Sequence, residues 1–190
     1  GRANTAIFAH GGQIWALHEA DAPYVLARKP GGVVETVGRM NFDGELDFPM
    51  TAHPRVDPKT GELFFYGYDL QKKPHCAVGI AEAQGRLNRI LDLGIDTPSL
   101  IHDCALTENY FVIIAPPIFF RPQDLMTTDH LPMVFEPREP LRIGVLPRTA
   151  DSGSEIEWFH LPSGAVFHGL NAWEEDGQIK LYAFRSRSVD

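Results

Sequence analysis

The stretch DPKTGELFFYGYDL, residues 57–70, decides the fold class, because a turn signal leads directly into a short apolar run. Residues 11–27, GGQIWALHEADAPYVLA, show the same arrangement with a Gly-Gly pair and two apolar runs around a polar turn. Apolar runs of about four to eight residues bounded by Gly, Pro and Asp are typical of β-strands joined by tight turns. Both stretches are therefore interpreted as meandering β-hairpins.

The same pattern extends along most of the chain, with turn signals at short intervals and no long helical periodicity. Many short strands predict an all-β sandwich, barrel or propeller. A four-stranded propeller blade takes about 40–50 residues, so this chain would hold about three to four blades, although no clean internal repeat marks them. The expected strands are residues 5–8, 13–18, 24–27, 51–56, 63–68, 76–80, 87–91, 101–106, 110–115, 141–146, 165–170 and 178–184.

Residues 115–140 depart from this pattern. They combine many prolines with hydrophobic residues, which predicts a long loop with a helical turn at 122–126. Long structured loops of this kind often cover an active site.

Length and composition indicate one globular domain, since the 190 residues are 44% hydrophobic and 22% charged. No apolar run approaches the roughly 18 residues of a transmembrane helix, although a small hydrophobic patch could still contact a membrane peripherally. The net charge of −8 argues against a nucleic-acid surface. Cys76 and Cys104 show no CxxC spacing, which favours a reducing compartment.

Both ends of the chain suggest a piece of a longer polypeptide. Residue 1 is Gly, no signal or transit segment precedes it, and the chain stops soon after an expected strand. Targeting information is therefore expected to lie outside residues 1–190.

Three of the eight histidines lie in apolar contexts. His53 stands before Pro54, which holds its backbone extended, whereas His102 begins an expected strand and His168 lies within one. A buried neutral imidazole needs partners for both nitrogens, and iron, zinc or copper is one kind of partner. The spacings of 49 and 66 residues match no local metal motif, so the residues alone favour core histidines. The histidines expected to be solvated, in turns or loops, are His10, His75 and His130.

The segments around these three histidines resemble the carotenoid cleavage dioxygenase family. TAHPRVDPKTGELFFYGYD (51–69) is similar to the first histidine motif of the family, IHDCALTENYFVI (101–113) to the second and FHGLNAWEEDGQI (167–179) to the third. NTAIFAHGGQIWALHEADAPYVL (4–26) and LRIGVLPR (141–148) also resemble family sequence, in the same order. TVGRMNFDGEL (36–46) and GYDLQKKP (67–74) are similar in style to plant and algal members, including the 9-cis-epoxycarotenoid-cleaving branch.

The resemblance implies part of a seven-bladed β-propeller with Fe(II) held on its axis by four histidines. His53, His102 and His168 match three of these ligands by motif, and the fourth has no counterpart in this sequence. Residues 1–190 would then form a single partial propeller domain, truncated at both ends. Such a piece is expected not to bind iron normally by itself.

The resemblance also assigns residues around the metal. Glu19 matches a family glutamate that accepts the free N–H of a ligand imidazole. The candidates for a substrate tunnel are Phe119, Phe120 and Phe167, although most phenylalanines in a β-rich fold belong to the core. His18 stands where stilbene-cleaving relatives tend to carry lysine, which makes a phenolic stilbene a less expected substrate.

The implied function is O₂-dependent cleavage of a carbon–carbon double bond of a carotenoid or apocarotenoid to two carbonyl products, including the 9-cis-epoxycarotenoid type. The implied partners are a hydrophobic polyene and O₂, in a plastid or the cytoplasm. The alternatives are a stilbene- or phenylpropanoid-cleaving oxygenase, a retinoid isomerase-like role, a non-catalytic propeller that binds a partner, and an inactive fragment that lacks the fourth ligand.

Overall fold

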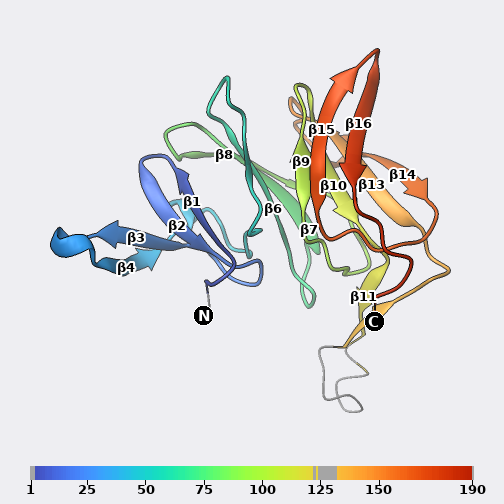
Figure 1. The fold of residues 1–190 in the computed structure, drawn as a ribbon, viewed down its shortest axis with the longest axis horizontal. Helices are drawn as coiled ribbons and strands as arrows, with labels where there is room; N and C mark the ends of the chain where they lie inside the picture. The colour runs from blue at the N-terminus through green and yellow to red at the C-terminus, as the bar shows by residue number, and fades with distance from the viewer. Residues whose placement is uncertain (1–2, 122, 124–131, 190) are drawn as a thin grey trace.

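The chain forms a series of antiparallel β-sheets that follow one another in sequence order (Figure 1). The computed structural model describes residues 3–121, 123 and 132–189. No α-helix occurs in this part of the chain, and none of its helical segments has the length and apolar character that a membrane crossing requires. The 3-10 helices with described bounds are η1 (Pro30–Gly32), η2 (Phe42–Gly44) and η4 (Gly153–Glu155).

Three sheets have four strands each. The first sheet has the order β1-β2-β3-β4, with β1 (Ala6–His10), β2 (Gln13–Leu17), β3 (Tyr24–Arg28) and β4 (Val34–Arg39). The second has the order β5-β6-β7-β8, with β5 (Arg55–Val56), β6 (Leu63–Tyr68), β7 (Cys76–Ala81) and β8 (Leu87–Asp92). The third has the order β14-β13-β10-β9, with β9 (Cys104–Leu106), β10 (Tyr110–Ala115), β13 (Leu141–Pro147) and β14 (Glu157–Leu161).

Two hairpins complete the described chain. β11 (Ile118–Phe120) and β12 (Met133–Phe135) pair with each other. In sequence, they follow β10 and precede β13. β15 (Gly169–Glu175) and β16 (Gln178–Ala183) form a final two-stranded sheet. Three four-stranded sheets and half of a fourth confirm the all-β prediction and the expected three to four propeller blades.

Some element predictions are wrong. β4 and β14 lie outside the expected strands, although both contain hydrophobic residues; every residue of β4 is exposed, and most of β14 is. The predicted loop at 115–140 contains β11 and β12 at its ends. The helical turn expected at 122–126 lies outside the described residues apart from residue 123, as does His130.

The two central strands of the second sheet are buried on both faces, since every residue of β6 and β7 is buried. Successive side chains of a strand point to opposite faces. Phe65 of β6 therefore packs with Trp15 of the first sheet, whereas Phe64 packs with Phe111 of the third. Burying one such side chain stabilises the fold by about 1.5–3 kcal/mol. This continuous apolar strand holds the flanking sheets in place.

Glycine lets neighbouring elements approach closely at two kinds of position. A Cβ at Gly79 of β7 would lie 2.1 Å from the ring of Phe65, so no larger residue fits. Gly11 has a φ of 55° in the two-residue β1–β2 turn, as such hairpins require. Beside that turn, His10 is only 7% exposed and its Nε2 lies 2.9 Å from the Glu82 carbonyl oxygen. The prediction that His10 is solvated is therefore wrong, because the turn packs against the second sheet.

Candidate metal centre

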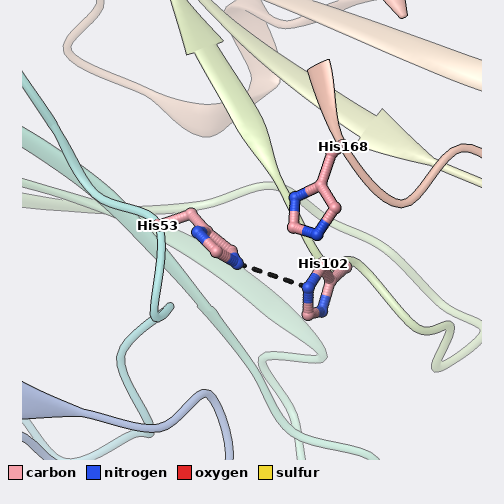
Figure 2. A group of neighbouring side chains, drawn as sticks. All are labelled: His53, His102 and His168. Atoms are coloured by element: carbon pink, nitrogen blue, oxygen red, sulfur yellow. Dashed lines mark hydrogen bonds between the residues drawn. The ribbon is translucent and has the colours of Figure 1, made fainter. Parts of the chain in front are cut away.

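His53, His102 and His168 come from three parts of the chain and face a common point (Figure 2). Their ring centroids form a nearly equilateral triangle, with separations of 4.9, 5.0 and 4.9 Å. The Nε2 atoms of His53 and His102 are 3.3 Å apart. One nitrogen from each ring lies within 4.8 Å of the others.

Each histidine precedes the first strand of a sheet: His53 precedes β5, His102 precedes β9 and His168 precedes β15. These first strands of consecutive sheets lie next to one another, since β9 contacts both β5 and β15. The three side chains therefore meet because equivalent positions of three sheets meet. His168 lies just before β15, whereas it was expected within a strand.

Local contacts fix the backbone around His53 and His102. The His53 N–H donates to Thr51 Oγ1 at 3.0 Å, and the Cys104 thiol donates to the His53 carbonyl oxygen at 3.3 Å. The buried Tyr66 hydroxyl donates to the Ile101 carbonyl oxygen at 2.9 Å, directly before His102. The segments that carry His53 and His102 are thus tied to each other.

Glu19, which follows β2, lies behind His102. Its Oε2 atom is 2.7 Å from His102 Nδ1, and this carboxylate raises the pKa of His102 above its usual value. A carboxylate on Nδ1 favours the tautomer in which Nε2 carries the free lone pair. Burial lowers the pKa of His53 below its usual value. The two pKa values are thus shifted in opposite directions, while the Nε2 atoms of both rings face each other at the common point.

Asp103 is the second carboxylate at the centre, and it is only 2% exposed. Its Oδ1 accepts hydrogen bonds from Arg55 at 2.7 Å and from the Cys104 N–H at 2.8 Å. Its Oδ2 accepts from the Gly169 N–H at 3.0 Å and lies 3.6 Å from His168 Nδ1. Asp103 and Arg55 were not predicted as site residues from the sequence. The signal that could have identified Asp103 is a charged residue within the otherwise mostly apolar segment 100–106.

The three imidazoles fit a transition-metal ion. Two ligand nitrogens at about 2.1 Å from one ion are about 3.0–3.4 Å apart when adjacent, and the His53–His102 separation of 3.3 Å falls in this range. Imidazole suits iron, zinc and copper alike. The geometry therefore indicates a metal centre without selecting the metal.

The predicted tunnel residues divide into two groups. The Phe167 ring lies 6.0 Å from the His102 ring, so the structure brings it to the centre. Phe119 and Phe120 lie in β11, and no aromatic contact within the described part of the chain joins them to the three histidines. The side chain of His168 is 58% exposed, which corrects the expectation that all three histidines are buried.

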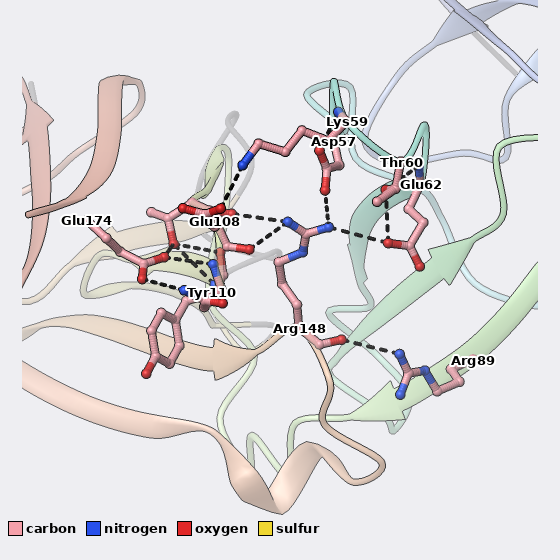
Figure 3. A network of polar contacts seen from close by, with 11 residues as sticks. Asp57, Lys59, Thr60, Glu62, Arg89, Glu108, Tyr110, Arg148 and Glu174 are labelled. Carbon is pink, nitrogen blue, oxygen red and sulfur yellow. Dashed lines mark hydrogen bonds and ion pairs between the residues drawn. The ribbon is translucent and has the colours of Figure 1, made fainter. Parts of the chain in front are cut away.

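Arg148 is the hub of a second polar cluster, which the sequence interpretation missed (Figure 3). Its guanidinium pairs with Asp57 and Glu62 of the second sheet and donates to the Glu108 carbonyl oxygen at 2.8 Å. Glu174 of β15 accepts from the Asn109 N–H at 2.7 Å in the same region. The cluster therefore links the second, third and fourth sheets. In the sequence these residues are isolated charges near strand ends, and such a pattern does not indicate which charges will pair.

Comparison with known proteins identifies sequences that are similar to this chain. The model of the family RPE65, retinal pigment epithelial membrane protein, matches residues 1–189. Carotenoid 9,10(9',10')-cleavage dioxygenase 1 of Arabidopsis thaliana is 37% identical over 190 residues, which is 100% of this chain and 35% of that protein. The chloroplastic 9-cis-epoxycarotenoid dioxygenase NCED1 of Oryza sativa is 37% identical over 95% of this chain and 28% of that protein. The chain thus spans about a third of the length of these curated relatives.

Solved structures agree with this assignment. Lignostilbene dioxygenase of Pseudomonas brassicacearum superposes with a TM-score of 0.83 at 29% identity, covering 94% of this chain and 37% of that one. Cobalt-substituted apocarotenoid oxygenase of Synechocystis gives a TM-score of 0.84 at 26% identity, covering 99% of this chain and 40% of that one. These neighbours are β-propellers, so the sheets described above are propeller blades. The chain therefore belongs to the RPE65 family, the carotenoid oxygenases that its three histidine motifs resemble.

Proposed function

We propose that the protein acts as an iron-dependent oxygenase that cleaves a carbon–carbon double bond of a carotenoid or apocarotenoid to two carbonyl products. The observation that supports this proposal is the convergence of His53, His102 and His168 from three blades, in a chain of this family. When bound, ferrous iron would activate O₂, whose two oxygen atoms end in the two carbonyl products. A 9-cis-epoxycarotenoid is one candidate within this substrate class.

The residues of this chain would hold the metal and position the substrate. The three imidazoles would bind the metal through the nitrogens that face the common point, and Glu19 would hold the His102 ring by its Nδ1 atom. Phe167 would offer an apolar surface beside the metal for a polyene. Such a site supplies position and shape to its substrate, with no acid or base required.

We further propose that the rest of the site, including a fourth histidine, is supplied by residues outside 1–190. This chain covers about a third of its curated relatives, and three imidazoles leave the triangle open on one side. Residues 1–190 alone would then hold iron weakly. One iron ion retained tightly per chain by residues 1–190 would contradict this part of the proposal and would also argue against an inactive fragment.

Metal analysis of the full-length protein that contains this chain tests the ligand assignment. His102→Ala should abolish iron binding and turnover. His160→Ala is the matched control, because His160 is exposed on β14 and far along the third sheet from the triangle. Unchanged iron content in His102→Ala, measured by mass spectrometry of the metal, would overturn the assignment.

Product analysis separates the candidate substrates. β-Carotene, an epoxycarotenoid and resveratrol should be offered to the same enzyme under labelled O₂. The similarity to lignostilbene dioxygenase favours a stilbene as the second candidate. Cleavage of resveratrol alone would replace the carotenoid proposal, label missing from the products would favour an isomerase-like role, and full iron without any turnover would favour a binding module.

The proposed role of Phe167 as a tunnel wall has its own test. Phe167→Ala should raise KM for the polyene several-fold while leaving the iron content unchanged, because the ring contacts His102 without being a ligand. Phe159→Ala is the control, since Phe159 is also exposed but lies on β14. An unchanged KM in Phe167→Ala would remove Phe167 from the tunnel.

We propose a plastid or the cytoplasm as the compartment, on the basis of relatives such as the chloroplastic rice dioxygenase. Fluorescence microscopy of the full-length protein fused at its C-terminus distinguishes the two. Peripheral contact with a membrane, which a polyene substrate would favour, is tested by co-sedimentation with lipid vesicles.

A further inference from the structure

We infer that Asp103 is a positioning residue that locks together the three chain segments carrying His53, His102 and His168, an inference that rests on the proposed metal centre. Asp103 is 2% exposed and lies in a segment whose neighbours Ile101 and Cys104 are buried. A buried carboxylate is costly unless it is paired and fully hydrogen-bonded. Its partners therefore show what the charge stabilises.

Each hydrogen-bond partner of Asp103 among the described residues lies within two residues of a histidine of the triangle. Arg55, two residues after His53, donates to Oδ1. The Cys104 N–H, two residues after His102, donates to the same oxygen. The Gly169 N–H, one residue after His168, donates to Oδ2. One carboxylate thus binds three segments that belong to three different sheets.

Arg55 extends this lock to the backbone of a ligand. Arg55 Nη1 donates to the His53 carbonyl oxygen at 3.4 Å, while Arg55 Nη2 donates to Asp103. The Cys104 thiol donates to the same carbonyl oxygen. Arg55 and Cys104 therefore connect the backbone of His53 to Asp103. Arg55 and Asp103 are 48 residues apart in the sequence.

Asp103 reaches the His168 segment through the backbone and not through the ring. At 3.6 Å, Asp103 Oδ2 is too far from His168 Nδ1 for a hydrogen bond, whereas the Gly169 N–H donates to the same oxygen at 3.0 Å. Asp103 thus differs from Glu19, which faces His102 alone within the triangle.

Asp57 provides a matched control for Asp103. Both are buried aspartates paired with an arginine, and their side chains are 7% and 3% exposed, respectively. The partner of Asp57, however, is Arg148 of the second polar cluster. Asp57→Asn therefore reports the cost of losing a buried inter-sheet pair whose partners, Arg148 and the Lys59 N–H, are not bonded to Asp103.

The test uses cobalt(II), whose visible absorption reports ligand geometry, bound to the full-length protein. Asp103→Asn should weaken cobalt affinity about 10–100-fold and change the absorption spectrum, measured by chelator competition in protein that is still folded by circular dichroism. Asp57→Asn should lower the unfolding temperature while keeping wild-type affinity and spectrum. If Asp103→Asn does not fold, Arg55→Lys, which keeps the charge but loses the forked contact, should show the same spectral change.

Two results would overturn the inference alone. One is wild-type affinity and spectrum in Asp103→Asn, or in Arg55→Lys where only that variant folds. The other is an equal loss of affinity in Asp57→Asn at equal loss of stability, which would make the effect a general one. A wild-type protein that binds neither cobalt nor iron would contradict the proposed metal centre itself, and this inference with it.

Discussion

Glu19 Oε2 lies 2.7 Å from His102 Nδ1, although Glu19 follows a strand of the first sheet and His102 precedes one of the third. The contact joins the first and third sheets directly, so the orientation of the His102 ring depends on how these two sheets are placed. Glu19→Gln keeps the shape of the side chain and removes its charge. We expect metal affinity to fall about 10–100-fold, because the Nδ1 proton loses its anionic acceptor.

Chelator competition in the full-length protein measures this change. Glu82→Gln is the control, since within the described part of the chain the Glu82 carboxylate pairs with the exposed Arg86 alone. Equal affinities for Glu19→Gln and the wild type would show that His102 is oriented without its carboxylate.

Arg148 should contribute more to stability than any exposed arginine. Its side chain is 13% exposed and pairs with Asp57, whose side chain is 7% exposed. Arg148→Ala leaves that carboxylate buried and unpaired, which costs about 3–5 kcal/mol. Urea unfolding measures the loss. Arg86→Ala, at an exposed i,i+4 pair, should cost less than about 1 kcal/mol, and equal losses in the two variants would refute the role of the cluster.

Stability should decline in acid as the second polar cluster protonates. Burial opposes the ionisation of Asp57, but hydrogen bonds from the Lys59 N–H and from Arg148 lower its pKa below the usual value. A lowered folded-state pKa contributes stability that is present above the unfolded value of about 3.9. That stability is lost as the pH falls through the lower folded value.

The measurement is the urea midpoint between about pH 2 and pH 6, below and above the unfolded aspartate pKa. Asp57→Asn should be less stable at pH 6 and should lose less stability on acidification than the wild type. Parallel pH profiles for the two proteins would show that Asp57 does not carry this dependence.

Gly79 should not tolerate a methyl group. A Cβ there would lie 2.1 Å from the Phe65 ring at the centre of the second sheet. Gly79→Ala should therefore cost about 1–3 kcal/mol through overpacking. Gly38→Ala is the matched strand control, because a Cβ at Gly38 meets nothing within 4 Å. Thermal unfolding of both variants compares them, and an unchanged midpoint for Gly79→Ala would mean that the Phe65 ring can move.

The strands that form the core could be predicted from the sequence. Residues 63–68 were expected as a strand and form β6 with the same bounds, because six consecutive buried residues follow a turn signal. β4 was missed although Val34, Thr36 and Val37 are β-branched and favour a strand. All six residues of β4 are exposed, so they show no alternation of buried and exposed positions, and the strand is held in the sheet by backbone pairing with β3.

The site was predictable only in part. His53, His102 and His168 could be selected by motif, and the structure brings them together, but their role as ligands stays a prediction. Two ion pairs of buried aspartates, Asp103 with Arg55 and Asp57 with Arg148, could not be predicted from the sequence. Their members are 48 and 91 residues apart, respectively. Local patterns carry no information about which distant charge a buried carboxylate will meet.

The β11–β12 hairpin leaves the third sheet after β10 and returns at β13, and β10 and β13 still pair in continuous register. β11 nevertheless pairs with the segment just before His102, since the Leu100 N–H donates to the Ile118 carbonyl oxygen at 2.8 Å and Ser99 forms a β-bridge with Phe119. The hairpin therefore braces the approach to one corner of the histidine triangle. A change that displaced β11 would be felt at His102, although β10 and β13 could keep their pairing.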